Sequence, residues 1–308
     1  MITPHPYRDE ADYWRVRAFL RDVLLLNGRR ELCWTTARFD YWRWHGLLSI
    51  LEGQVPIESV LYLWEEDGAL IAALNGEDRG DAFLQVHPAR RSAALLEEMV
   101  EVAEAQLAEP AEGGRVLRVW ANEGDAPLEA ILRRRGYTPQ PWAETHRWQT
   151  LDREIAPPVV APGYTVRPLG GEEELPARSW VSWRAFHEDE PDEKYGGWTW
   201  YHTIQRIPLY RRDLDIVAVA PGGEHAAFCT IWYDDVTRTG YVEPVGADPA
   251  HRRRGLAAAV VTENLRRLQR LGATLAYVGA YSVRANALYG SLGFEAYGLS
   301  RPWEKAGL

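Results

Sequence analysis

The residues best suited to chemistry lie in one basic turn of the 308-residue chain, Arg252-Arg253-Arg254-Gly255. A strand-like run, 245–247, precedes this turn. The apolar residues of the following segment, 256–271, recur three or four positions apart, as on one face of a helix, and Gly272 stands where a glycine often ends a helix. The first amides of a helix lack intrahelical partners and lie at the positive end of its dipole. The turn could therefore bind phosphate oxygens, and Gly255 would let the backbone approach the anion closely.

The same turn has two other interpretations. It could be a solvated basic loop that happens to open a helix, or part of a nucleic-acid-binding patch. The formal net charge of the chain is −9 at pH 7, which argues against a polyanionic partner, so we expect no nucleic acid. The turn carries a single glycine and no Gly-x-Gly-x-x-Gly pattern, which argues against a dinucleotide site.

A second motif follows the helix. It consists of a strand-like run, 273–280, and the segment Ala285-Asn286-Ala287-Leu288-Tyr289, completed by Leu292-Gly293-Phe294. Arg252-x-x-Gly255-x-Ala257 resembles the acyl-CoA pyrophosphate loop of the GNAT N-acetyltransferase superfamily, whose pattern is Gln/Arg-x-x-Gly-x-Gly/Ala. The second motif is similar to the later helix and terminal strand of that family, in a fitting order and spacing. The resemblance implies an α/β (α+β) fold, with a mixed, mostly antiparallel central sheet flanked by helices, and acetyl-CoA as the cosubstrate.

The resemblance also implies which residues bind the cofactor. The amides of residues 253–258 would take the pyrophosphate, the strand before the turn would carry the pantetheine arm, and the Val245 N–H would stabilise the oxyanion. Ser282 replaces an asparagine often found in the family, which weakens one expected polar contact. The expected cofactor-binding residues are Val245, Gly246, Ala247, Arg252, Arg253, Arg254, Gly255, Leu256, Ala257, Ala258, Ser282 and Asn286.

Two residues interrupt the strand that precedes the turn. Pro244 cannot donate to a sheet ladder, so it belongs at an edge or a bulge, and Gly246 indicates a close approach or a bulge. In GNAT proteins the corresponding strand splays from its neighbour to admit the cofactor, so a missing donor costs little there. The alternative is an irregular edge strand.

Two residues are candidates for proton transfer. Tyr289 occupies the general-acid position of the family, and a phenol with a pKa of ~10 can protonate a thiolate whose conjugate acid has a pKa of ~8.5 only if it lies close to the sulfur. Its alternative role is that of an aromatic core residue. Glu243 lies two residues before Val245, so we expect both side chains on one face, where the carboxylate could take an amine proton directly or through water. Several family members place this glutamate two positions earlier, where the chain has Tyr241, so a structural or substrate-orienting role also stays open.

We expect the acceptor to be the amine of a small molecule. The segment 180–210, which covers the acceptor side in this fold, combines an acidic run, 188–193, with many rings, a composition that suits a cationic amine. The alternative is that the rings are core residues and that the acidic run is a solvated loop. The rings belong to Trp180, Trp183, Phe186, His187, Trp198, Trp200, Tyr201, His202 and Tyr210.

The length and one proline-rich segment predict two domains. Three prolines within 154–163 indicate a stiff linker between an N-terminal GNAT-like domain, 1–153, and a C-terminal catalytic GNAT domain, 164–308. The elements expected after the linker are a strand at 164–168, two helical segments within 172–207, and strands at about 214–220, 225–233 and 239–247.

The first half repeats the second in altered form. Residues 84–91 parallel 245–252, and 128–137 parallel the run that ends at Phe294. This layout of tandem GNAT domains is also found in the mycothiol synthases. Ala94 stands at the position of Gly255, and Leu132, which has no proton to give, stands at the position of Tyr289. We therefore expect a degenerate domain with a structural or substrate-shaping role; the alternative is a second acyl-CoA site with a variant loop.

Composition restricts the remaining classes. The two cysteines, Cys33 and Cys229, predict neither a disulfide framework nor a metal site. No apolar run approaches the ~20 residues of a membrane-spanning helix, and the N-terminus lacks a signal-peptide pattern. We therefore expect a cytoplasmic protein with no membrane partner, either a monomer or a homodimer. A non-catalytic acyl-CoA sensor and a structural scaffold are the functional alternatives; Tyr289 argues against the first, and the intact loop, 252–257, argues against the second.

Overall fold

The computed structural model describes residues 4–50, 54–77 and 79–308, and the chain forms two compact units. The N-terminal unit comprises residues 1–146 and 297–308, and the C-terminal unit comprises residues 147–296. This division differs from the predicted one, because the end of the chain returns to the first unit. There, Ser300–Ala306 of β14 (Glu295–Ala306) pair antiparallel with β6 (Gly114–Asn122). The predicted linker, 154–163, contains no helix or strand.

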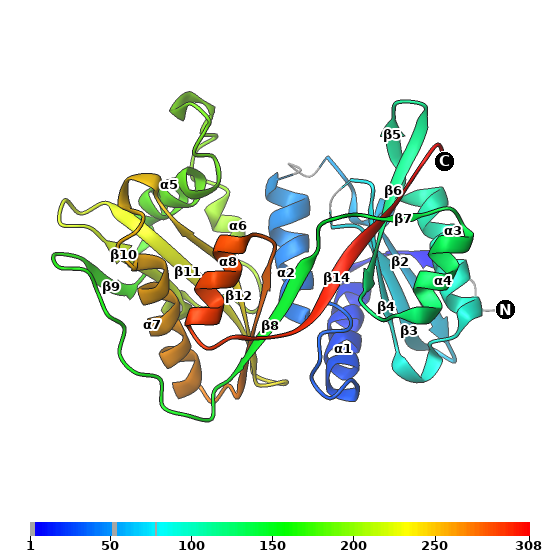
Figure 1. The fold of residues 1–308 in the computed structure, drawn as a ribbon, viewed down its shortest axis with the longest axis horizontal. Coiled ribbons are helices and arrows are strands. Elements are labelled where there is room, and N and C mark those ends of the chain that lie inside the picture. Colours follow the sequence, from blue (N-terminus) through cyan, green and yellow to red (C-terminus); the bar gives the residue numbers. More distant parts are fainter. Residues whose placement is uncertain (1–3, 51–53, 78) are drawn as a thin grey trace. The chain divides into compact units, whose positions relative to one another are not determined.

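The N-terminal unit is built on a mostly antiparallel sheet with the strand order β1-β2-β3-β4-β6-β14, in which β4 and β6 are parallel (Figure 1). Its other strands are β1 (His5–Pro6), β2 (Leu61–Glu66), β3 (Ala69–Asn75), β4 (Asp81–Val86), β5 (Glu109–Ala111) and β7 (Thr138–Pro139). Its helices are α1 (Glu10–Leu26), α2 (Thr36–Tyr41), which continues as a π-helix (Trp42–Ile50), α3 (Ala93–Gln106) and α4 (Ala126–Arg134). Strand β8 (Glu144–Thr150) crosses into the second unit.

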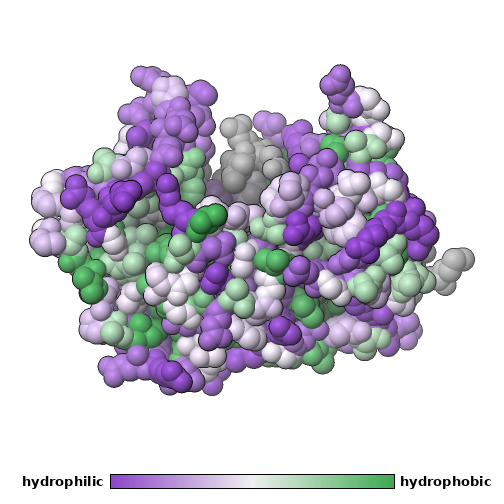
Figure 2. Space-filling model, viewed as in Figure 1, coloured by the Kyte–Doolittle hydropathy of each residue, from purple (hydrophilic) through white to green (hydrophobic). Residues whose placement is uncertain are grey.

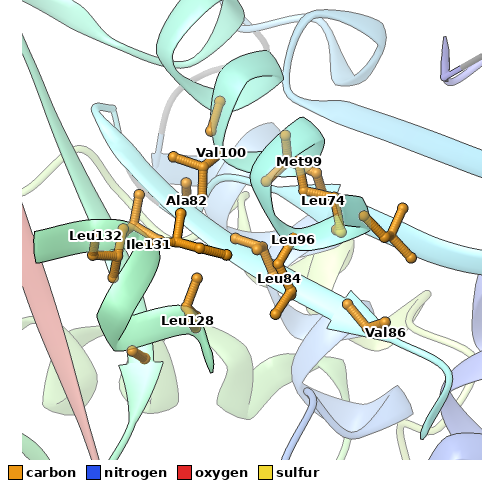
Figure 3. Packing of buried hydrophobic residues seen from close by; sticks show 14 of the residues in the cluster. Leu74, Ala82, Leu84, Val86, Leu96, Met99, Val100, Leu128, Ile131 and Leu132 are labelled. Carbon is orange, nitrogen blue, oxygen red and sulfur yellow. The ribbon is translucent and has the colours of Figure 1, made fainter. Parts of the chain in front are cut away.

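Both faces of this sheet are covered, because successive residues of a strand point to opposite sides. Apolar residues of α3 and α4 pack on one face, and an aromatic cluster that includes Tyr13, Phe39 and Trp42 packs on the other. Figure 3 shows the first of these cores, formed among others by Leu74, Ala82, Leu84, Val86, Leu96, Met99, Val100, Leu128, Ile131 and Leu132. Leu132, the position that parallels Tyr289, is thus a fully buried core residue.

The C-terminal unit has the strand order β8-β13-β12-β11-β10-β9. Its strands are β9 (Thr165–Pro168), β10 (Asp215–Val219), β11 (His225–Asp234), β12 (Thr239–Ala247) and β13 (Leu275–Ala280). Its helices are α5 (Leu175–Phe186), α6 (Tyr201–Gln205), α7 (Leu256–Arg270) and α8 (Val283–Ser291). Neighbouring strands from β9 to β12 are antiparallel, whereas β12 and β13 are parallel. The predicted mixed, mostly antiparallel sheet with flanking helices is confirmed.

The two faces of β11 show how the C-terminal helices are placed. Cys229 and Ile231 belong to the core that α7 completes with Val260, Val261 and Leu265. The alternate residue Phe228 points to the other face, where its ring meets that of Phe186 at the end of α5. The sheet is therefore sandwiched, with α7 and α5 on opposite sides.

The two helical segments predicted across 172–207 are confirmed as α5 and the short α6, with an irregular stretch between them. Helix α5 ends at Phe186 and α6 begins only at Tyr201, because Pro191 and the pair Gly196-Gly197 break the helical pattern between them. The acidic residues fall in this irregular segment, which Figure 2 shows as a hydrophilic projection above α5.

Among the described residues, no helix is long and apolar enough to span a membrane. In the same residues, no group of three or more acidic, histidine or cysteine side chains could hold a metal ion. Cys33 and Cys229 are free thiols that lie in different units.

Candidate active site

The site begins where two parallel strands separate. Strand β12 pairs with β13 from Thr239 to Tyr241, which lies opposite Tyr277, and within the described chain this pairing ends there. Strand β12 itself continues to Ala247. The backbone of 242–247 is therefore not engaged by β13 on that side and can bond to a bound molecule. This opening agrees with the splayed strand expected around Pro244.

The turn after β12 leaves the start of α7 open. Gly255 is the N-cap residue with a φ of 74°, and no side chain caps the helix. The first helical bond runs from Ala259 N–H to Gly255 O (3.0 Å), so the amides of 256–258 have no partner within the helix. Arg253 also has a positive φ, 62°. Successive turns of this kind direct backbone amides into a concavity that binds anions.

A cavity of about 820 Å³ connects the open strand to this turn and to α8. Its volume is in the range of ~300–1,000 Å³ that is common for small-molecule sites. Most of the expected site residues line it, namely Val245, Gly246, Ala247, Arg252, Arg253, Gly255, Leu256, Ala257, Ala258, Ser282 and Tyr289. Three expected residues, Glu243, Arg254 and Asn286, do not line it.

Asn286 holds the local backbone instead of lining the cavity. Its Nδ2 donates to the carbonyls of Ala280 (3.3 Å) and Ser282 (3.1 Å), and its Oδ1 accepts from Arg147 Nε (2.9 Å). The Ser282 Oγ caps α8 by accepting from Ala285 N–H (3.1 Å). These two side chains fix the turn from β13 into α8, and this turn positions Tyr289.

The expected placement of Glu243 and Val245 on one face is wrong because β12 contains a bulge. Val242 pairs with Ile231 and Val245 with Cys229, so two residues of β12 lie opposite one residue of β11. Ile231 and Cys229 share the face that α7 covers. Val242 and Val245 therefore share that face, and Glu243 points to the face that α5 covers.

Gly246 is required by the close approach of α5. A Cβ at this position would lie 2.6 Å from Phe228 Cζ and 2.7 Å from Ala185 Cβ, distances that real Cβ atoms do not adopt. Ala185 and Phe186 themselves line the cavity. The expected close approach at Gly246 is thus a contact with the protein's own helix, and this contact brings the end of α5 against the open strand.

Tyr289 combines a core position with access to the cavity. Its side chain is 6% exposed and its ring packs against that of Phe294 at 5.7 Å, while it also lines the cavity. Burial, and then the nearby ionisable groups Cys229 and Glu243, raise the pKa of the Tyr289 phenol above its usual value. The hydroxyl therefore stays protonated at neutral pH and can donate a proton.

Most rings of the segment 180–210 contact one another. Trp183 stacks between Trp180 (5.5 Å) and His187 (5.5 Å), and Trp198 packs against His202 (5.1 Å). Phe186 is the member of this set that lines the cavity. Trp200 contacts Tyr201, and the hydroxyls of Tyr201 and Tyr210 bond to the buried Asp215.

Three carboxylates of the acidic run, 188–193, form ion pairs. Asp192 pairs with Arg184 (3.1 Å) and Glu190 with Lys194 (3.2 Å). Glu188 pairs with Arg252, whose guanidinium also donates to Ala185 O (3.3 Å). Arg252 thus ties the segment after α5 to the end of β12, in addition to lining the cavity. The carboxylates that would attract a cationic acceptor are already neutralised in part.

Several lining residues were not expected from the sequence. Arg284 and Ala285 open α8, Leu288 lies one residue before Tyr289, and Pro249 and His251 belong to the turn. Arg284 offers a second positive charge beside the open helix start. The sequence feature that could have predicted this role is a basic residue at the start of the helix that carries Tyr289. The contribution of Ala185 and Phe186 had no local signal, because it depends on the packing at Gly246.

The N-terminal unit differs at the corresponding turn. Helix α3 is capped by its own Ser92, whose Oγ accepts from Leu95 N–H (3.2 Å), so part of the helix start is already satisfied. Arg91, the counterpart of Arg252, pairs with Asp125 at the start of α4. Both features reduce the capacity of this turn to bind phosphate oxygens.

Part of the chain matches a known protein family. Residues 176–294 match the family described as Acetyltransferase (GNAT) family. A mycothiol acetyltransferase from Streptomyces scabiei is 27% identical over 201 residues, and the aligned part spans 61% of each chain.

Two solved structures show the fold over nearly the whole chain. A GCN5-related N-acetyltransferase from Sphaerobacter thermophilus is 18% identical with a TM-score of 0.69, covering 99% of this chain and 95% of that one. A tandem GNAT protein from the clavulanic acid biosynthesis pathway is 17% identical with a TM-score of 0.67, covering 99% and 98%. The family match contains the open turn, α7 and Tyr289. The segment of this chain that matches the GNAT acetyltransferase family therefore contains the residues that line the cavity.

Proposed function

We propose that the C-terminal unit is an acetyl-CoA-dependent N-acetyltransferase that moves the acetyl group from the CoA thioester to the amine of a small molecule by direct attack. One observation carries the proposal: β12 separates from β13 over a cavity that extends to the uncapped start of α7 and to Tyr289. The family match and the acetyltransferase relative support the same reaction class.

The residues present fit the cosubstrate. The unpartnered amides of 256–258 and the left-handed Gly255 suit a pyrophosphate, and Arg253 and Arg284 add positive charge beside it. The free edge of β12 suits the amide groups of a pantetheine arm, which can add to the strand as another strand would. At the inner end of this path, the Val245 N–H would stabilise the negative charge that develops on the thioester carbonyl oxygen.

The proton balance needs one base and one acid. The attacking amine forms the C–N bond and gives up a proton, while the C–S bond breaks and the thiolate accepts one. Glu243 would take the amine proton from the α5 face, and Tyr289 would protonate the sulfur. The apolar surroundings raise the pKa of the Tyr289 phenol. They also disfavour the thiolate and therefore raise the pKa of the thiol. The two pKa values are thus closer to each other than the raised phenol pKa alone implies.

The N-terminal unit lacks both chemical features. Its turn is capped by Ser92, and Leu132 occupies the position of the acid. We propose that it binds no acetyl-CoA and turns nothing over. A screen of primary amines, amino acids, alcohols and carboxylic acids for acetyl-CoA consumption tests the proposed acceptor class. Turnover restricted to amines supports the proposal, whereas turnover of alcohols or acids alone rejects it.

We expect Glu243→Gln to lower the rate by about 10²-fold at pH 7, the usual scale for losing a general base. Glutamine keeps the shape and the hydrogen bonding but cannot accept a proton. The deficit should shrink as the pH rises, because more of the amine is then already neutral. The pH–rate profile with a good amine acceptor measures this, and Glu295→Gln, an exposed glutamate of the same unit, serves as the control. A profile in Glu243→Gln that keeps its height and shape removes Glu243 from the mechanism.

A further inference from the structure

The N-terminal unit contains a cavity of its own. It has a volume of about 300 Å³ and lies where β4 and β6 part, between the turn that leads to α3 and the start of α4. Its lining includes Trp34, Phe83 and Trp120, and Phe83 lies 4.9 Å from Trp34 and 5.2 Å from Trp120, measured between ring centroids. A volume at the low end of ~300–1,000 Å³ with aromatic walls fits a compact organic molecule.

Three buried side chains of this lining carry a polar atom with no hydrogen-bond partner in the part of the chain that the structure describes. These atoms are the Glu31 Oε1, the Trp34 Nε1 and the His146 Nε2, on side chains that are 4–6% exposed. A buried polar group without a partner destabilises the fold. The group comprises one acceptor, one indole N–H donor and one imidazole nitrogen, so a molecule that both donates and accepts would satisfy it.

The charges of the cavity are those of an ion pair. The His146 Nδ1 faces the Glu31 Oε2 at 3.6 Å. Burial by itself would lower the pKa of His146, but the neighbouring carboxylates of Glu31 and Glu144 outweigh burial and raise the pKa. A raised pKa favours the imidazolium form of His146, in which the Nε2–H is a donor, while the Glu31 Oε1 is an acceptor.

The two arginines that line the cavity are already paired. The guanidinium of Arg38 bonds to Glu144 (2.9 Å) and Glu77 (2.9 Å), and Arg91 pairs with Asp125. The side chains left to meet a small molecule include the His146 imidazole, the Glu31 carboxylate and the Trp34 indole donor, beside aromatic rings, and the exposed Glu123 also lines the cavity. A purely cationic molecule would lie beside His146, and a purely anionic one beside Glu31, each against a like charge.

We propose that this cavity binds a zwitterionic small molecule, an α-amino acid with an apolar side chain, as a site separate from the acyl-transfer site. The ammonium group bonds to the Glu31 Oε1, and the carboxylate accepts from the His146 Nε2–H and the Trp34 Nε1–H. The side chain packs against Phe83 and Trp120. The side-chain cap on α3 and the Arg91–Asp125 pair reduce the capacity of this turn to bind a pyrophosphate, which disfavours acetyl-CoA as the occupant.

Calorimetry on the full chain tests this with three probes of one shape: L-phenylalanine, phenethylamine, which lacks the carboxylate, and 3-phenylpropanoic acid, which lacks the ammonium. We expect L-phenylalanine to bind at least tenfold more tightly than either other probe, because only it satisfies both charges. This comparison uses the unaltered protein, so it does not depend on how a variant folds. Equal affinities for the three probes, or no heat of binding from any of them, would overturn the proposal.

The variant Trp34→Phe keeps the ring and removes the N–H donor. It should weaken L-phenylalanine binding about tenfold or more, whereas Trp14→Phe, an exposed tryptophan of the same unit that does not line the cavity, should leave it unchanged. Gly255→Asp, which targets the other unit, should also leave it unchanged, and this separates the proposal from the acyl-transfer activity. Unaltered affinity in Trp34→Phe, or an acetyl-CoA equivalent lost in that variant, would contradict it.

Discussion

Gly255→Asp should reduce acetyl-CoA binding by two orders of magnitude or more. The added carboxylate lies at the open start of α7, where it can compete with a phosphate oxygen for the free amides. It also adds a like charge beside the pyrophosphate. A hydrogen bond to a charged group is worth about 1.5–3 kcal/mol, and the loss of two corresponds to about 100-fold or more in affinity. Isothermal titration calorimetry with acetyl-CoA measures this directly.

Two variants separate charge from backbone strain. Gly255 has a φ of 74° and a Cβ there would meet nothing within 4 Å, so Gly255→Ala tests the left-handed conformation alone, at a cost of about 1–2 kcal/mol. Ala94→Asp places the same acid at the exposed residue that parallels Gly255 in sequence, in the first turn of α3, and should leave binding unchanged. Two equal acetyl-CoA sites per chain in the unaltered protein, or a loss of binding in Ala94→Asp, would show that the first unit also holds the cofactor.

Tyr289→Phe should slow acetyl transfer by about 10²-fold while acetyl-CoA affinity stays within about twofold. Phenylalanine keeps the ring that packs against Phe294 but has no proton for the departing thiolate. The effect should appear in kcat, because the phenol acts on the reacting sulfur and contributes little to binding. Tyr281→Phe, an exposed tyrosine that precedes α8, is the matched control and should keep its activity. Normal turnover in Tyr289→Phe with a good acceptor would leave Tyr289 with a packing role only.

The features of the site that depend on consecutive residues could be predicted from the local sequence pattern. Gly255 followed by an amphipathic helix predicted an open helix start, and α7 begins at Leu256 with that glycine in a left-handed conformation. Pro244 and Gly246 predicted an irregular strand, and the structure has a bulge beside one and a close helix approach at the other. These features follow from short-range sterics and backbone hydrogen bonding, which the sequence encodes position by position.

Features that depend on distant partners were not predictable in the same way. The face of Glu243 follows from a bulge whose register is visible only against β11. The division between the units depends on the pairing of β14 with β6, which lies far away in sequence. The roles of Ala185 and Phe186 at the cavity require the packing of α5 on β12, and the polar residues around Glu31 come together only in the folded N-terminal unit.

The most direct test of the central claim measures both products of one reaction. Acetyl-CoA is incubated with a primary amine acceptor, and free CoA thiol and N-acetylated amine are quantified together by thiol titration and mass spectrometry. The account predicts equal amounts of the two products, abolished in Gly255→Asp, reduced about 10²-fold in Tyr289→Phe, and unchanged in Ala94→Asp. Binding of acetyl-CoA with neither product above the uncatalysed level across a broad amine panel would contradict the account and favour a non-catalytic acyl-CoA sensor.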